Sequence, residues 1–430
     1  MNKQTIITIM LALVWVTGQA QVKCHIEGTI ASDKLGDEIL IYEKGTDLEF
    51  YDDPRYHVKA KGGRFTYDIE TDCPRLYKVV IRKPRNDGNY EGSFLTENGT
   101  VKVTLYADQA PKVISDGTEG RMYQVLDSIE DARFWEPIDE IDDKIENPDR
   151  LKEFYDAGFL STFAEAERMN KEEMPHAYVD SLRKVLNQYY KNPRSQYTEA
   201  GWILQQRRDS LSNAISPFRV AYYTEHPMLW ALYDTKEALV RLNLAFAFPN
   251  FDPSKYEPYL TLYHEKLSTL YPGHPVHQQI ASAEAAYRLQ PGKPYMDYTV
   301  RNVDGQLVPI SSLIKGKVAL IDLWASWCGS CRKHSKAMIP VYERYKDKGF
   351  TVIAIAREKK REYMEKAMQV DGYPWPSLLE LNDENQVWRK NGADNAGGRM
   401  FLIDRDGTIL STSTDAEELE PLIKKALNIE

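Results

Sequence analysis

The chain has 430 residues, and its 55 basic and 64 acidic side chains give it a formal net charge of −9. An acidic chain lacks the positive surface that attracts nucleic acid or an anionic membrane, so neither is expected as a partner. The length suits two or three domains of roughly 100–200 residues each.

Residues 1–20, MNKQTIITIMLALVWVTGQA, have the pattern of a secretory signal peptide. Lys3 is their only charged residue, an apolar run covers 6–16, and Ala20 closes a small-residue cleavage site. The apolar run is too short to cross a membrane, which takes about 20 residues. We therefore expect an exported protein of the periplasm or cell envelope, with no membrane span once the signal is removed.

Residues 21–117 are predicted to form a small antiparallel β-sandwich. Apolar and polar residues alternate between turn signals, which predicts strands in EILIYEKG (38–45), GRFTYDIE (63–70) and LYKVVIRK (76–83). In SFLTENGTVKVTLY, the Asn98-Gly99 pair predicts a tight hairpin turn between two strand-like arms.

Two of the four cysteines lie in this β region. Cys24 stands at the start of its first strand, and Cys73 just follows a later one. Disulfides form and persist in exported proteins, so the two residues are candidates for a structural disulfide, which the sequence alone leaves open.

Residues 118–290 are predicted to form a helical linker domain. Apolar residues recur at helical spacing in SLRKVLNQYY (181–190) and in EALVRLNLAF (237–246). Prolines divide the region into segments. Its many aromatic residues are interpreted as core rather than as a cofactor site.

Residues 291–430 are predicted to form an α/β sandwich with a mixed sheet. KVALIDLWA (317–325) and FTVIAIA (350–356) are almost continuously apolar, as buried central strands require, and a helix over 331–346 separates them. The remaining predicted elements are two short strands around Asp304-Gly305, a charged helical segment after 356, and a hairpin in FLIDRDGTILSTS around Asp406-Gly407.

Cys328 and Cys331 have the spacing of a redox-active dithiol. Thiol–disulfide exchange needs one thiolate to attack a disulfide sulfur and a second thiol close enough to resolve the mixed disulfide. If Cys328 opens the helix after 317–325, Cys331 lies on the same face, and the positive end of the helix stabilises the first thiolate. Arg332, which follows the pair, is interpreted as a solvated side chain.

A metal site and a purely structural disulfide both fit the cysteine pair less well. A zinc site normally takes four ligands, the pair supplies two, and His334 on the helix points away from Cys328, so no metal is predicted. A disulfide of this spacing closes too small a loop to stabilise the fold much. The pair itself is therefore the redox centre, and no other cofactor is expected.

The sequence LWASWCGSC after a buried strand resembles the thioredoxin active site, W-C-G-P-C. The wider stretch GKPYMDYTVRNVDGQLVPISSLIKGKVALIDLWASWC, within 291–430, resembles the TlpA/ResA-like family of exported thiol–disulfide oxidoreductases. The resemblance implies a thioredoxin-like fold in which Asp322 accepts the Cys331 proton and Trp327 shields the pair. It also implies protein thiol or disulfide substrates, an envelope electron donor and a duty such as cytochrome c maturation. The N-terminal β region resembles an accessory domain of unassigned function (DUF4369).

Two departures from the family pattern keep alternatives open. Ser330 replaces the proline of the active-site turn, so the sequence does not say whether the pair reduces or oxidises its substrate. The family's cis-proline position is Gly398, and Gly398 with the preceding Gly397 is expected to contact substrate through the backbone. The missing proline leaves a second interpretation, a non-catalytic binding module on a degenerate thioredoxin scaffold. A thiol peroxidase is a third and weaker one, because Ala325 stands where peroxiredoxins have threonine.

Overall fold

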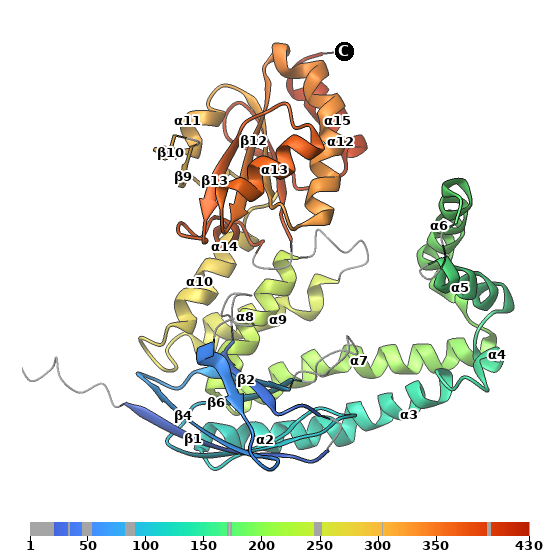
Figure 1. The fold of residues 1–430 in the computed structure, drawn as a ribbon, viewed down its shortest axis with the longest axis vertical. Helices are drawn as coiled ribbons and strands as arrows, with labels where there is room; N and C mark the ends of the chain where they lie inside the picture. Colours follow the sequence, from blue (N-terminus) through green and yellow to red (C-terminus); the bar gives the residue numbers. More distant parts are fainter. Residues whose placement is uncertain are drawn as a thin grey trace, which may run out of the picture. The chain divides into compact units, whose positions relative to one another are not determined.

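A computed structural model of the chain describes residues 21–32, 35–44, 54–81, 91–169, 172, 174–244, 252–302, 304–393 and 397–429 (Figure 1). The predicted signal peptide lies outside these residues. The chain forms two compact units, the first consisting mainly of residues 21–44 and 56–226 and the second mainly of residues 227–429. In the described part of the chain, no helix is long and apolar enough to cross a membrane. The predicted domain boundaries after 117 and 290 stay predictions.

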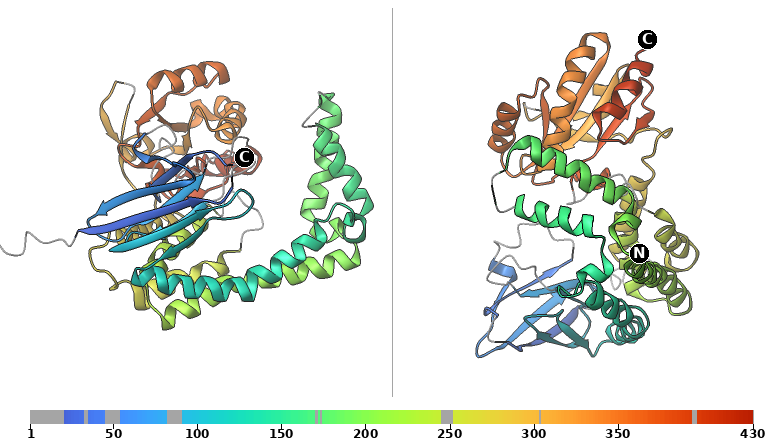
Figure 2. Two further views of the ribbon diagram at one scale, coloured as in Figure 1. Left: turned by 60° about the horizontal axis from the view of Figure 1, so that its bottom comes forward. Right: turned by 90° about the vertical axis from the view of Figure 1, so that its right-hand side faces the viewer.

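The first unit begins with two four-stranded sheets, in the orders β4-β1-β7-β8 and β3-β2-β5-β6 (Figure 2). Ile26 and Val101 from the first sheet share a buried core with Ile39 and Val79 from the second, so the predicted β-rich, sandwich-like region is confirmed. The strands are β1 (Val22–Ile30), β2 (Glu38–Glu43), β3 (His57–Lys59), β4 (Arg64–Thr71), β5 (Leu76–Ile81), β6 (Glu91–Leu95), β7 (Gly99–Leu105) and β8 (Lys112–Ser115).

The predicted hairpin around Asn98-Gly99 is wrong. Its two arms lie in different sheets, because β6 pairs with β5 whereas β7 pairs with β1 and β8. The connection is fixed by tertiary contacts instead: Asn98 Oδ1 accepts a 2.8 Å hydrogen bond from Lys23 N, and the Glu97 carboxylate accepts from two backbone N–H groups at the start of the next helix. Since β1 and β7 run parallel, the sandwich is also not purely antiparallel.

Cys24 and Cys73 are free thiols in this structure, so it does not contain the disulfide that the sequence left open. Cys24 is buried in the sandwich core opposite Ile69 of β4, whereas Cys73 lies beyond the end of that strand. Cys73 is thus four positions along the chain from the residue that faces Cys24. Burial raises the pKa of the Cys24 thiol to about 11.

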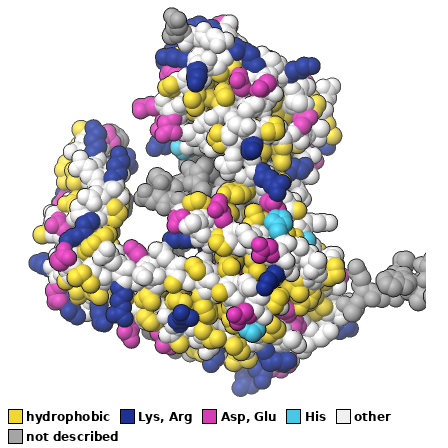
Figure 3. Space-filling view, turned by 180° about the vertical axis from the view of Figure 1, so that it is seen from behind, with side chains coloured by type: hydrophobic (Ala, Val, Ile, Leu, Met, Phe, Trp, Pro, Cys, Tyr) yellow, Lys and Arg dark blue, Asp and Glu magenta, His cyan; other side chains and the backbone are white. Residues whose placement is uncertain are grey.

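The rest of the first unit is helical. α2 (Thr118–Glu130) continues through a π-helical turn into α3 (Glu136–Ile145), and the turn and α3 pack against the long helix α7 (Glu199–Glu225). Arg219 binds the buried Glu130 with two hydrogen bonds, of 2.6 and 2.7 Å. The helices between α3 and α7 are α4 (Leu151–Phe154), α5 (Ala157–Met169) and α6 (His176–Lys191). Large apolar side chains are exposed on α5 and α6 among charged ones (Figure 3).

The second unit has a seven-stranded sheet in the order β10-β9-β13-β12-β11-β14-β15. Its strands are β9 (Thr299–Arg301), β10 (Leu307–Pro309), β11 (Val318–Trp324), β12 (Phe350–Glu358), β13 (Ser377–Leu381), β14 (Met400–Ile403) and β15 (Ile409–Ser411). Its helices are α8 (Leu229–Asn243), α9 (Glu257–Leu262), α10 (Val276–Tyr287), α11 (Ile310–Ile314), α12 (Gly329–Tyr345), α13 (Arg361–Asp371), α14 (Val387–Lys390) and α15 (Ala416–Ala426).

β11 is the strand that positions the cysteine pair. It runs parallel to β12 and antiparallel to β14, and every one of its residues is buried. α12 packs on β11 and β12, and Arg344 of α12 binds Glu420 of α15 at 2.7 Å. The mixed α/β sheet is therefore confirmed, and β13, which the sequence did not predict, lies inside it between β9 and β12.

Candidate active site

The two cysteines lie where β11 meets α12. Cys328 is the N-cap residue of α12, and it forms a disulfide with Cys331 across a Cα–Cα distance of 5.3 Å. The backbone N–H of Cys331 donates to Cys328 Sγ at 3.3 Å, so the first sulfur faces the N–H groups of the helix start. Each cysteine is only 6% exposed.

Ser330, in place of the family proline, puts a hydroxyl near Cys328. Its Oγ lies 3.6 Å from Cys328 Sγ. Because a sulfur in a disulfide carries no proton, the Ser330 hydroxyl is the donor of this long contact. The active-site turn therefore offers Cys328 a side-chain donor that a proline does not have.

Asp322 is buried on β11, with 1% of its surface exposed. Its Oδ2 accepts a hydrogen bond of 2.7 Å from Ser335 Oγ, and Ser335 Oγ also lies 3.0 Å from the carbonyl oxygen of Cys331. Burial raises the pKa of Asp322 to about 7, and the Ser335 hydrogen bond opposes that rise. The carboxyl group can therefore hold or release a proton near neutral pH, beside the helical turn that begins at the second cysteine.

Gly398 lies directly beside Cys331. Its backbone N–H donates to Cys331 Sγ at 3.1 Å, and Leu323 N–H donates to the carbonyl oxygen of the next residue, Arg399, at 2.9 Å. Gly397 has a φ of 138°, which favours glycine. All peptide bonds between described residues are trans, so this backbone approaches the sulfur without the cis bond of the family.

Trp327 precedes the pair and is 53% exposed. Its ring centroid lies 5.5 Å from that of Trp388 on α14, which is buried. The Arg357 guanidinium lies over the Trp388 ring, 5.5 Å from its centroid. The indole of Trp327 thus packs against Trp388, while about half of the side chain is exposed to solvent, one residue before Cys328.

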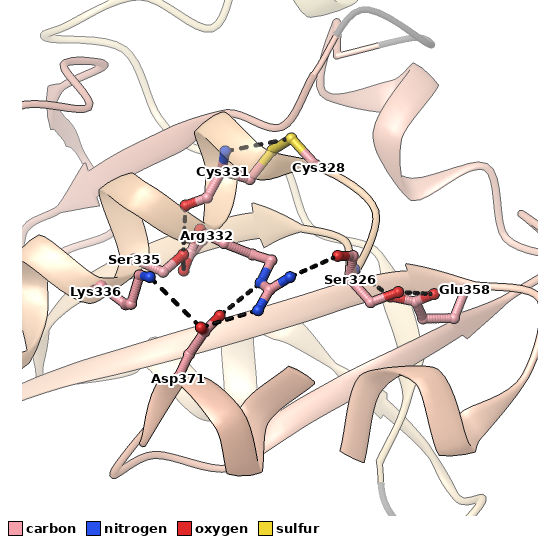
Figure 4. A network of polar contacts seen from close by, with 9 residues as sticks. Ser326, Cys328, Cys331, Arg332, Ser335, Lys336, Glu358 and Asp371 are labelled. Carbon is pink, nitrogen blue, oxygen red and sulfur yellow. Dashed lines mark hydrogen bonds and ion pairs between the residues drawn. A yellow bond between two sulfur atoms is a disulfide. The ribbon is translucent and has the colours of Figure 1, made fainter. Parts of the chain in front are cut away.

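Arg332 is not the solvated side chain that the sequence suggested. It binds the carboxylate of Asp371, at the end of α13, with hydrogen bonds of 2.6 and 2.9 Å, and its Nη1 reaches the Ser326 carbonyl oxygen at 3.3 Å (Figure 4). Lys336 adds a 3.5 Å ion pair to the same carboxylate. These groups hold the pKa of Asp371 below its usual range, with Arg332 the main cause.

A second buried acid fixes the loop before Cys328. Glu358, at the end of β12, accepts hydrogen bonds from the backbone N–H and, at 2.9 Å, from the hydroxyl of Ser326 (Figure 4). Burial raises the pKa of Glu358, and the two hydrogen bonds oppose it. Ser326 is therefore held from two sides, by Glu358 and by Arg332. No sequence signal points to this network, because its acids lie far along the chain from Ser326.

His334, the further candidate metal ligand near the pair, lies on α12 and lines a groove of about 450 Å³ with Lys333, Arg344, Asp415 and Glu417. Among the described residues, no three or more His, Cys, Asp or Glu side chains are grouped to hold a metal ion.

The part of the chain that contains the cysteine pair matches a known protein family. The model of the Redoxin family matches residues 290–427. These residues form a redoxin domain. The expected thioredoxin-like fold of this part of the chain is thereby confirmed, and its disulfide lies at the β11–α12 junction.

The redoxin domain is similar to proteins whose names describe disulfide chemistry. It is 27% identical over 141 residues to the thiol-disulfide oxidoreductase ResA of Bacillus thuringiensis (strain Al Hakam), covering 32% of this chain and 79% of that protein. It is 27% identical over 118 residues to the thiol:disulfide interchange protein DsbE of Pseudomonas fluorescens biotype C, covering 27% of this chain and 63% of that protein. These names agree with the expectation of an oxidoreductase.

Solved structures also align with the redoxin domain. The thioredoxin domain of a thiol-disulfide oxidoreductase from Bacteroides vulgatus is 27% identical, with a TM-score of 0.30, and the alignment covers 33% of this chain and 99% of that one. A thiol:disulfide interchange protein from Bacteroides sp. is 26% identical, with a TM-score of 0.30, covering 33% and 91%. The resemblance of residues 21–117 to an accessory domain stays a prediction.

Proposed function

We propose that the protein is a thiol–disulfide oxidoreductase of the bacterial cell envelope that works through Cys328 and Cys331. The observation that carries this proposal is the disulfide itself, formed at a helix N-terminus and contacted by the Cys331 N–H, the Ser330 hydroxyl and the Gly398 N–H. Donors around a sulfur stabilise its thiolate, the form that reacts in exchange.

In the reducing direction, the Cys328 thiolate attacks one sulfur of a substrate disulfide and releases the other as a thiolate. Cys331 then attacks Cys328 Sγ, so the Cys328–Cys331 bond forms and the bond to substrate breaks. Two electrons pass to the substrate, and an envelope electron donor restores the dithiol. Asp322 accepts the Cys331 proton through a water molecule, because its Oδ1 has no hydrogen-bond partner among the described residues.

Trp327 and the backbone of Gly397 and Gly398 are the proposed substrate contacts. Trp327 presents an exposed indole beside Cys328, and Gly398 contacts Cys331, so the two flank the disulfide. A substrate chain can approach the backbone at Gly397, because no atom lies within 4 Å of the position that a Cβ atom would take there. The residue 1–20 pattern supports export, and thiols of an apocytochrome are a candidate substrate by resemblance to the family.

Reduction of insulin by the full mature chain tests the proposal. We expect the wild type to reduce insulin with dithiothreitol as donor, Cys328→Ser to lose the activity, and Cys73→Ser to keep it. Undiminished activity in Cys328→Ser would remove this residue from the reaction. A dithiol that reduces no disulfide with any donor would instead support the binding-module interpretation, which rests on the glycine at 398.

Trapping identifies the substrate. In Cys331→Ala the mixed disulfide on Cys328 cannot be resolved, so captured proteins accumulate and can be identified by mass spectrometry. The Cys328→Ser/Cys331→Ala double variant is the matched control and captures none. A redox titration of the pair against glutathione then separates a reductant from an oxidant.

A further inference from the structure

The backbone N–H group of Gly398 donates a hydrogen bond to the Cys331 sulfur, which a proline at residue 398 could not do. Proline has no backbone N–H, whereas Gly398 N lies 3.1 Å from Cys331 Sγ. The sulfur is only 6% exposed, so this donor acts where water does not replace it. In the oxidised protein the acceptor is a weakly basic disulfide sulfur, and on reduction it becomes a thiol or thiolate.

Glycine is the only residue that fits this approach. A Cβ atom on residue 398 would lie 1.6 Å from the carbonyl oxygen of Leu323 and 3.1 Å from Cys331 Sγ. The neighbouring backbone is fixed by the β11–β14 pairing, in which Asp322 stands opposite Met400 and Leu323 N–H binds Arg399 O at 2.9 Å. The sheet therefore aims the Gly398 N–H at the sulfur and leaves no room for a side chain.

We propose that Gly398 is a catalytic residue through its backbone, with an N–H group that stabilises the thiolate of Cys331 in the reduced protein. A hydrogen bond to a charged acceptor is stronger than one to a neutral sulfur, so the donor favours the thiolate over both the thiol and the disulfide. The inference deepens the proposed function and rests on it, because Cys331 is the resolving residue of that reaction.

Two consequences follow for the chemistry. Burial alone raises the pKa of a thiol, and the Gly398 donor opposes this, so more Cys331 is ready to attack the Cys328–substrate bond at neutral pH. In that step the Cys331–Cys328 bond forms, the bond from Cys328 to substrate breaks, and the leaving thiolate takes a proton from water. Because the donor stabilises the dithiol state, it also makes the pair a stronger oxidant.

Nuclear magnetic resonance of the full mature chain observes the donor directly. The sequence contains two Gly-Gly pairs, 62–63 and 397–398, so glycine labelled with ¹³C at the carbonyl and ¹⁵N gives one-bond carbonyl–amide correlations for Gly63 and Gly398 alone. In the Cys328→Ser variant we expect the Gly398 amide proton to move downfield with the ultraviolet absorbance of the Cys331 thiolate as pH rises. Gly63, in the turn before β4, is the internal control. A Gly398 signal that follows Gly63 instead would overturn the proposal.

Removal of the N–H group provides a second test that avoids adding atoms. Glycolic acid introduced at residue 398 by cell-free translation replaces the amide with an ester and keeps the side chain absent. We expect alkylation of Cys331 at pH 7 in the Cys328→Ser background to slow about tenfold, since a hydrogen bond to a charged group contributes at least one pKa unit. The same ester at Gly397 is the matched control. Equal rates of Cys331 alkylation in the 398 and 397 ester variants would contradict the proposal. A wild-type protein that does not reduce insulin would count against the proposed function only.

Discussion

Ser335 Oγ donates a hydrogen bond of 2.7 Å to Oδ2 of Asp322, while Oδ1 of the same carboxyl group has no hydrogen-bond partner among the described residues. Ser335 also touches the Cys331 carbonyl oxygen, at 3.0 Å. The acid is therefore tied to the helix of the second cysteine through one of its oxygens, and the other oxygen is left for a proton.

Asp322→Asn should change stability in a pH-dependent way. Burial raises the folded-state pKa of Asp322 from 3.8 to about 7, so the folded protein binds more protons than the unfolded chain between these values. The stabilising contribution of protonated Asp322 to the free energy of unfolding is therefore fully present below pH 4 and is lost as pH rises to 7. We expect Asn to match the wild type at pH 4 and to be more stable at pH 8 by up to about 4 kcal/mol, at ~1.4 kcal/mol per pKa unit.

Urea denaturation of the oxidised chain at the two pH values measures this difference. An equal effect at pH 4 and pH 8 would rule out titration of Asp322 as its cause. The same variant should reduce insulin about 10²-fold more slowly at neutral pH, the scale of a lost proton acceptor.

Ser330→Ala should make the Cys328 thiol less reactive. The hydroxyl lies 3.6 Å from Cys328 Sγ, so its loss removes a weak donor, and alkylation of Cys328 at pH 7 should slow about threefold. Ser330→Thr keeps the hydroxyl and is the control. Rates of iodoacetamide reaction in the Cys331→Ala background measure the effect, and identical rates in the Ala and Thr variants would show that the hydroxyl does not act on the sulfur.

Arg332→Ala should destabilise the redoxin domain by about 2–4 kcal/mol, because it leaves a buried carboxylate with a single cationic neighbour. The side chain of Asp371 is 3% exposed, and among the described residues only Lys336, at 3.5 Å, remains as its ion-pair partner. The folded-state pKa of Asp371 is lowered, so its stabilising contribution is present at neutral pH and lost in acid; the variant should lose this acid sensitivity.

Lys333→Ala, an exposed neighbour on the same helix, is the control for Arg332→Ala. Denaturation midpoints from pH 3 to 7 compare the two variants. If both lose the same stability, the buried ion pair does not carry the effect.

Two glycine-to-alanine changes in helices should have opposite effects. A Cβ atom at Gly201, in the first turn of α7, would lie 1.8 Å from the Phe154 carbonyl oxygen, so Gly201→Ala should cost about 1–3 kcal/mol. At Gly329, in the first turn of α12, a Cβ atom meets no atom within 4 Å, so Gly329→Ala should be neutral or stabilising by up to about 1 kcal/mol. Thermal unfolding checks the pair; a stable Gly201→Ala would refute the close α4–α7 contact.

Local sequence pattern was sufficient to predict the strand and helix that carry the cysteine pair. It did not predict structure that depends on contacts between distant residues. An unbroken apolar run predicts a buried strand, and three-residue spacing places Cys328 and Cys331 on one helix face. Both β11 and α12 could therefore be predicted from the sequence. The Asn98-Gly99 hairpin was mispredicted because Glu97 and Asn98 are anchored by distant backbone groups, which turn chemistry does not encode.

The other interactions that the sequence did not predict depend on contacts between residues far apart in the chain. Arg332 and Asp371 are 39 positions apart and meet only after α12 and α13 pack. Gly398 could be recognised as a departure from the family, but its hydrogen bond to Cys331 depends on the register between β11 and β14. Neither position carries a periodic or compositional signal, so the sequence alone could not assign its role.

The different burial of the four sulfurs makes the redox state countable in the intact protein. Cys24 is 2% exposed and its pKa is raised, so it resists alkylation until the sandwich unfolds, whereas Cys73 is partly exposed and can react in the folded chain. One added label on the native chain thus reports an oxidised 328–331 pair, three report a reduced pair, and the fourth reports unfolding. The mass of a single unmutated sample can then distinguish electron transfer at the pair from loss of the N-terminal fold.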